Sequence, residues 1–90
     1  MRMFNPPHPG EVLHDYLEGV SITQATSRLQ ISRSRLSRIL NGHAPVRADM
    51  ALRLAALLKT RAELWAGMQS EYDLWLASQK PRPVIRSRRG

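Results

Sequence analysis

The sequence predicts a small all-α domain. Its 90 residues contain several stretches in which apolar residues recur three and four positions apart, which is the spacing of one helix face. Strand-like alternation is nearly absent, and Ser, Pro, Asn and Gly separate the stretches where helices would start or stop. Because a chain of this length buries only a modest core, we expect one domain.

The composition narrows the class of protein. The chain has no cysteine, which excludes disulfides and thiolate metal sites and is typical of a reducing cytoplasm. No apolar run approaches the roughly 18 residues of a membrane span. No signal-peptide pattern opens the chain. We therefore expect a cytoplasmic protein.

Positive charge is segregated along the chain. The formal net charge is +7, yet residues 1–20 and 62–79 are net acidic. Residues 28–61 carry eight Arg or Lys against one acid, Asp49, and residues 80–90 carry five and no acid. This distribution favours a polyanion partner, nucleic acid first, over a charge that serves only solubility.

An extended arm and a first helix are predicted at the N-terminus. Two prolines oppose helix formation within residues 1–8, which we expect to form the arm. Pro9 suits the first helical position, and His8 is expected to cap that helix. The helix is predicted to run to about Glu18 and to stop at Gly19. Its apolar face consists of Val12, Leu13, Tyr16 and Leu17.

The stretch 21–42 contains two short helical patterns, and the first begins at Ser21. The Ser21 hydroxyl and Gln24 have the S-x-x-Q spacing of a capping box. Gln30 and Ile31 form the turn that ends the pattern. Its inner stripe consists of Ile22, Ala25, Thr26 and Leu29.

The second pattern begins at the cap Ser32 and ends at Asn41 and Gly42, which tolerate a left-handed backbone. Its inner face consists of Leu36, Ile39 and Leu40. Its outer face has no acid and consists of Arg33, Ser34, Ser37 and Arg38, with Arg35 on a flank. A solvated face usually mixes charge signs, so this face is predicted to meet an anion. The arrangement is that of a helix-turn-helix, whose second helix enters the DNA major groove.

Two further helices and a tail are predicted. The helix over about residues 48–59 is apolar nearly all round, so we expect it at the centre of the bundle with the first three helices packed on it. The last helix covers about residues 61–78. Residues 80–90 combine prolines with like charges and are predicted to be a disordered basic tail, either a solvated terminus or a binding element.

The last helix carries one long apolar stripe, and its second half exceeds what so small a domain can easily cover. This stripe can be interpreted either as part of the core or as a dimer surface. Helix-turn-helix proteins bind as two-fold dimers with recognition helices about 34 Å apart, which favours a homodimer. The stripe consists of Leu64, Trp65, Met68, Tyr72, Trp75 and Leu76. All of these residues except Leu64 form the expected dimer interface.

The sequence offers no catalytic or metal-binding constellation. His8, His14 and His43 are scattered and have no acids or thiols in ligand spacing. The serines of residues 32–37 have no histidine in sequence range to act as a base. We therefore expect no enzyme, metal or cofactor.

A series of short motifs has a familiar order and spacing. The motifs are Pro7-His8-Pro9-Gly10-Glu11, Asn41-Gly42, Ala51-Leu52-Arg53-Leu54-Ala55, Glu63-Leu64-Trp65, Met68-Gln69 and Tyr72-Asp73-Leu74. Over roughly residues 5–78 the chain resembles the HigA (VapI-like) antitoxins, a branch of the lambda-repressor-like or XRE helix-turn-helix family. The resemblance implies a five-helix dimer of the bacterial nucleoid that represses its own operon. It also implies neutralisation of a HigB-type toxin, a ribonuclease that degrades mRNA on ribosomes.

Functional positions follow from the resemblance. Base-reading positions fall on Arg33, Ser34 and Arg38, and Ser32 falls where a phosphate contact is usual. Three residues depart from the pattern: Thr26 and Gln30 stand where the wider family prefers Ala and Gly, and Arg47 stands where a Ser or Thr cap is common. Arg47 then either weakens the following helix start or contacts phosphate. The predicted DNA-binding set is Ser32, Arg33, Ser34, Arg35, Ser37, Arg38 and Arg47.

Other functions stay open at this point. A stand-alone phage- or plasmid-type repressor without a toxin is the main alternative, and an adjacent reading frame for a small basic ribonuclease would argue against it. A pure interaction module that has lost DNA binding is disfavoured by the basic outer face of residues 32–40.

Overall fold

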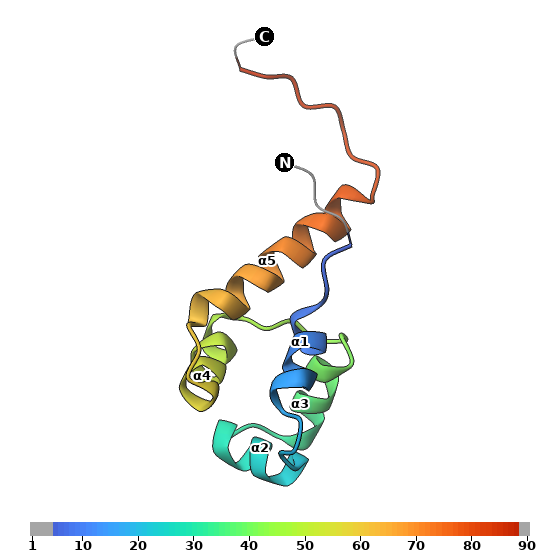
Figure 1. Cartoon of the computed structure of the whole chain (residues 1–90). Helices are drawn as coiled ribbons and strands as arrows, with labels where there is room; N and C mark the ends of the chain where they lie inside the picture. Colours follow the sequence, from blue (N-terminus) through green and yellow to red (C-terminus); the bar gives the residue numbers. More distant parts are fainter. Residues whose placement is uncertain (1–4, 89–90) are drawn as a thin grey trace.

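Within residues 5–88, which the computed structural model describes, the chain forms five helices and no strand. The helices are α1 (Pro9–Tyr16), α2 (Ile22–Leu29), α3 (Arg33–Leu40), α4 (Ala48–Leu58) and α5 (Ala62–Ser78). The predicted all-α fold with a long C-terminal helix is confirmed. Figure 1 shows α5 lying across α1 and α4, with α2 and α3 at the far side from its C-terminal end.

The described parts of both terminal segments lie outside the helices. Residues 5–8 of the expected arm have no helix, and residues 1–4 fall outside the described part of the chain. Residues 81–87 of the tail are exposed and have no regular structure, and residues 89–90 are likewise not described. In Figure 1 the tail leads away from the end of α5, opposite to α2 and α3.

Helix α1 begins with the predicted cap at His8. The His8 Nδ1 accepts a hydrogen bond from the backbone N–H of Gly10 at 2.9 Å, and the Glu11 carboxylate accepts from the His8 N–H at 3.2 Å. His8 is buried, and this burial lowers its pKa, an effect that nearby Glu11 opposes. The cap therefore works with a neutral imidazole, because Nδ1 must be free to accept.

The helix ends differ from the prediction by a few residues. Helix α1 ends at Tyr16 rather than at about Glu18, because the N–H groups of Glu18 and Val20 bond to carbonyls three residues back instead of the helical four. Gly19 still makes the turn, with a φ of 83°.

At the end of α3 the expected left-handed stop is taken by Gly42 alone. Its φ is 76°, whereas Asn41 has a φ of −91°. The glycine can adopt this backbone without the steric cost of a Cβ.

The core consists of buried apolar side chains from all five helices, the turn after α1 and the loop before α4. They are Leu13, Leu17, Ala25, Leu29, Leu36, Ile39, Leu40, Val46, Met50, Ala51, Leu54 and Trp65. Trp65 is fully buried, and its Nε1 donates to the Thr60 hydroxyl at 2.8 Å, which satisfies the one polar atom of the indole. The Tyr16 ring makes a T-shaped contact with this indole, with centroids 5.2 Å apart.

The expected central place of α4 is wrong. Helix α4 packs mainly against α5 and to a lesser extent against α2. Only Met50, Ala51 and Leu54 are buried, while Leu52 is 65% exposed. A helix of a five-helix domain this small meets neighbours on one side only, so an apolar residue on its other side stays in solvent. Ile22, expected on the inner stripe of α2, is also exposed.

Helices α1 and α3 approach closely at Gly10. A Cβ added to Gly10 would collide with the backbone carbonyl of Ile39, so any larger side chain would force the two helices apart. Helix α1 therefore sets where the C-terminal half of α3 lies.

A buried glutamine ties the α3–α4 loop to α5. The Gln69 Oε1 accepts from the Val46 N–H at 2.8 Å, and the Gln69 Nε2 donates to Asp73 at 2.9 Å. The amide thus satisfies a buried backbone donor that has no helical partner. This contact fixes the loop that leads into α4.

The outer half of α5 keeps apolar surface open. Tyr72 and Trp75 are half-buried, while Leu74 is 57% and Leu76 39% exposed. The Tyr72 ring packs against His8, with centroids 4.9 Å apart. The structure therefore leaves Trp75 and Leu76 available to a partner, whereas Trp65 belongs wholly to the core of one chain.

Candidate nucleic-acid interface

Helices α2 and α3 form the predicted helix-turn-helix. The Ser21 hydroxyl accepts from the Gln24 N–H and the Ser32 hydroxyl accepts from the Arg35 N–H, both at 3.0 Å. Between the helices Gln30 adopts a left-handed backbone, with a φ of 58°. The sharp turn is therefore made by a residue whose Cβ makes this conformation sterically unfavourable.

The other departure from the family pattern, Thr26 in α2, is accommodated by local hydrogen bonds. Thr26 is buried, and its hydroxyl donates to the carbonyls of Ile22 and Thr23 at 2.9 and 3.1 Å. These hydrogen bonds to the preceding turn satisfy the hydroxyl within α2. Thr26 can therefore occupy the buried position where the wider family prefers alanine.

The outer face of α3 is open to solvent. Ser34 and Ser37 are exposed, and so are Arg33 and Arg38. Arg33 reaches the Thr23 hydroxyl only at 3.5 Å, and Arg38 reaches the His43 carbonyl only at 3.4 Å. Such long contacts are weak, so both guanidinium groups are free to bind an anion or a base edge.

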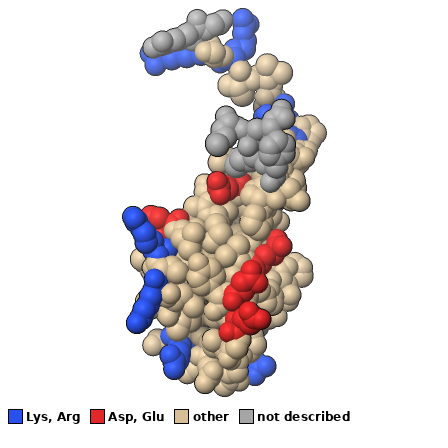
Figure 2. Space-filling view, in the orientation of Figure 1, with Lys and Arg blue, Asp and Glu red and all other residues tan. Residues whose placement is uncertain are grey.

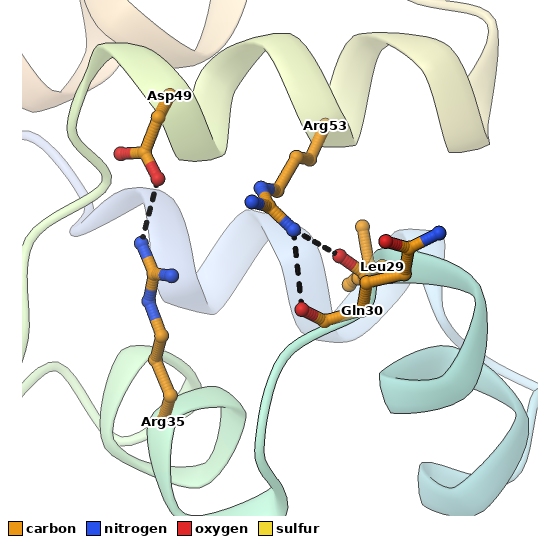
Figure 3. Close-up of polar contacts among 5 residues, drawn as sticks. All are labelled: Leu29, Gln30, Arg35, Asp49 and Arg53. Atoms are coloured by element: carbon orange, nitrogen blue, oxygen red, sulfur yellow. Dashed lines mark hydrogen bonds and ion pairs between the residues drawn. The ribbon is translucent and has the colours of Figure 1, made fainter.

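Arg35 is placed differently from the other arginines of α3. Its guanidinium donates to the Asp49 carboxylate at 3.1 Å, which joins α3 to the first turn of α4 (Figure 3). The hydrogen bond from Arg35 lowers the pKa of Asp49. The one acid within residues 28–61 is therefore paired, and part of the charge of Arg35 is offset by this exposed intramolecular contact.

Arg53 makes a second link from α4 to the motif. One guanidinium nitrogen of Arg53 donates to the carbonyl oxygens of Leu29 at 2.8 Å and Gln30 at 3.1 Å (Figure 3). These carbonyls lie at the C-terminal end of α2, where no intrahelical donor remains. Sequence reasoning missed this contact, although a lone arginine in an apolar helix was a signal.

Two of the residues predicted to contact DNA, Ser32 and Arg47, directly precede α3 and α4. Ser32 uses its oxygen as an acceptor for the α3 cap, which leaves its O–H free to donate. Arg47 precedes α4 and is exposed, and its side chain makes no capping hydrogen bond. Arg47 therefore does not replace the Ser or Thr cap.

Charge is divided between different faces of the molecule. Figure 2 shows Lys and Arg at the edge of the helical body where α4 and the start of α5 lie and along the tail, while Asp and Glu form a stripe across the face where α1 lies. The exposed acids of α1 and the turn after it are Glu11, Asp15 and Glu18. A polyanion is therefore repelled from the α1 face, whereas the outer face of α3 presents no acid to it.

Residues 5–88 contain neither a cluster of metal ligands nor a membrane-spanning helix. No three His, Asp or Glu side chains in this range are close enough together to hold a metal ion. No helix there is long and apolar enough to cross a membrane.

Comparisons with known proteins agree with this geometry. A helix-turn-helix domain family matches residues 16–66. Virulence-associated protein A' of Dichelobacter nodosus is 41% identical over 76 residues, which cover 81% of this chain and 66% of that protein. The chain thus spans about two thirds of the length of this relative.

Solved structures extend the likeness to the whole fold. An addiction module antidote protein of the HigA family from Coxiella burnetii is 34% identical, with a TM-score of 0.77 over 90% of this chain and all of that one. The Pseudomonas aeruginosa antitoxin HigA, solved with the higBA promoter, is 30% identical, with a TM-score of 0.76 over 89% of this chain and 99% of that one. The latter shows a protein of this fold on its promoter DNA.

Proposed function

The chain belongs to the HigA-like branch of the XRE-type helix-turn-helix proteins, and on this premise we propose that it is the antitoxin of a type II toxin–antitoxin pair. It represses its own operon as a homodimer and neutralises a HigB-like ribonuclease that degrades mRNA. The support is a relative of 34% identity described as a HigA-family antidote and another of 30% identity bound to its promoter.

The observation that carries DNA binding is the acid-free, solvent-open outer face of α3. Arg33, Ser34 and Arg38 read base edges, because an arginine fork matches the two acceptors of guanine in the major groove. Ser32, Ser37 and Arg47 contact the phosphate backbone, where donors set the position of a protein on the duplex. Arg35 joins them once DNA competes with Asp49 for its guanidinium.

Operator recognition is tested by Arg33→Ala. This change should cost about 1–3 kcal/mol on the operator and relax preference at one base pair, with a smaller loss on a scrambled duplex. Arg61→Ala is the matched control, since Arg61 is an exposed arginine at the start of α5. An equal loss on both duplexes would show that Arg33 touches only phosphate.

Dimerisation uses the open half of α5. Tyr72, Trp75 and Leu76 form the centre of the interface and Met68 lies at its inner edge, while Trp65 supports α5 from within the core. A dimer doubles the contacts of α3, because one recognition helix reads only a few base pairs and two-fold symmetry presents two helices about 34 Å apart.

Toxin neutralisation is tested by sequencing the genes that adjoin the gene of this chain and co-expressing the chain with any small basic ribonuclease found there. Growth arrest by that ribonuclease should be relieved by this chain, and the two proteins should co-purify. Operator binding with neither a neighbouring toxin gene nor neutralisation would identify a stand-alone repressor instead.

A further inference from the structure

We propose that Arg53 is a positioning residue for operator recognition: from α4 it holds the α2–α3 turn, and hence the angle of α3, without touching DNA. The inference rests on the proposed DNA-binding function. It assigns a role to a residue outside the predicted DNA-binding set.

The contacts of Arg53 reach across 23 and 24 residues of sequence to the strained point of the motif. The Gln30 carbonyl belongs to the residue with a φ of 58°, and the Leu29 carbonyl belongs to the last residue of α2. Both oxygens face the same guanidinium nitrogen, as Figure 3 shows. With Gln30 in this backbone conformation the two adjacent carbonyls converge on one donor, so the hydrogen bonds favour the left-handed turn.

The turn needs such support because Gln30 carries a side chain. A glycine would adopt the left-handed conformation freely, whereas a residue with a Cβ adopts it at a cost. The positive charge of Arg53 also lies at the C-terminal end of α2, where a cation is favoured by the helix dipole. Arg53 therefore offsets the strain at Gln30 through both hydrogen bonds and charge.

Arg53 belongs to a part of α4 that is anchored in the core. Its neighbour Leu54 is fully buried, and so are Met50 and Ala51 one turn earlier in α4. The Arg35–Asp49 pair links α3 to the same helix near its start. In the free protein the end of α2 and the first turn of α3 are thus both linked to α4, and once DNA takes up Arg35 the contacts of Arg53 remain to hold the turn.

A fixed orientation matters more for specific than for nonspecific binding. Base edges must be met by Arg33 and Arg38 at set positions, whereas phosphates accept a cation from many directions. A protein that is already ordered loses less conformational freedom on binding. Loss of Arg53 should therefore weaken the operator complex selectively.

The experiment compares the full chain with Arg53→Ala and Arg53→Lys, on the operator and on a scrambled duplex, over a series of salt concentrations. Arg28→Ala is the matched control, because Arg28 is an exposed arginine of α2 close to the same turn in sequence. We expect Arg53→Ala to lose about tenfold on the operator, as for one charge-assisted contact, and less than about twofold on the scrambled duplex. The slope of log affinity against log salt should stay unchanged.

A second readout needs no DNA. The backbone amide signals of residues 30–33 should shift or broaden in Arg53→Ala and recover in part in Arg53→Lys, whose ammonium can reach the carbonyls but lacks the planar fork. Circular dichroism checks that both variants are folded. If the alanine variant does not fold, the lysine variant is used for the same measurements.

Two results would overturn the proposal. One is an equal loss on both duplexes together with a slope smaller by about 0.9, which is the change expected when a protein neutralises one phosphate fewer. The other is a folded Arg53→Ala variant whose turn amides and operator affinity are unchanged. If the unaltered chain binds no DNA upstream of its own gene, the proposed function fails, while the amide signals still decide the positioning role.

Discussion

Gly10→Ala tests the close approach of α1 to α3. In an unconstrained helix, alanine is more stable than glycine by about 0.5–1 kcal/mol, because glycine loses more backbone freedom on folding. At Gly10 the added methyl would collide with the Ile39 carbonyl oxygen and crowd the carbonyl carbon at 2.9 Å. These are backbone atoms of α3, so no side chain can turn aside to make room.

The magnitude follows from the two opposing effects. Overpacking of a well-filled contact costs about 1–3 kcal/mol or more, which exceeds the helix-propensity gain. We expect a net loss of about 1–2 kcal/mol in the free energy of unfolding, which corresponds to roughly 4–15 °C in Tm for a domain of this size. Operator affinity should fall as well, because α3 is displaced.

The assay is urea unfolding followed by circular dichroism, at one protein concentration for all variants. Gly67→Ala is the matched control: it makes the same change within α5, where no neighbouring atom lies within 4 Å of the added Cβ. This control should gain about 0.5–1 kcal/mol. If Gly10→Ala gains stability as Gly67→Ala does, the proposed steric limit between α1 and α3 is refuted.

Three other predictions concern assembly, the tail and the α1 cap. Trp75→Glu would bury a charge in the α5 contact and should yield a folded monomer with weak operator binding; a dimer of full helicity in sedimentation and circular dichroism would place the interface elsewhere. Deleting residues 80–90 should flatten the salt dependence of operator binding by about 0.9 for each phosphate that the tail neutralises, and an unchanged slope would assign the tail to another role. Burial lowers the pKa of His8 below 6.5, so the unfolded chain protonates first as the pH falls. The stability due to neutral His8 is full above pH 6.5 and is lost as the pH falls through the folded-state pKa. His8→Asn should keep a cap and remove this dependence in unfolding measured across that range, whereas an unchanged pH profile would exclude His8 as its source.

The helices and the face offered to DNA could be read from the residues in order. Ser21 and Ser32 cap α2 and α3 through a donor three positions on, and Leu36, Ile39 and Leu40 face inward because of their spacing. Interactions of this kind join residues within one turn of a helix. Their geometry is therefore set by the local chain, whatever the helix packs against.

The contacts that hold the outer face of α3 in position could not be read from the sequence, because they depend on how the helices pack together. Arg35 meets Asp49, and Gln69 meets Val46, across 14 and 23 residues of sequence. The exposure of Leu52 likewise reflects which side of α4 finds a neighbour. A hydrophobic pattern states that a residue can be buried but not which helix will cover it. The pairing of distant polar groups is decided only when the packed helices bring a donor within about 3 Å of its acceptor.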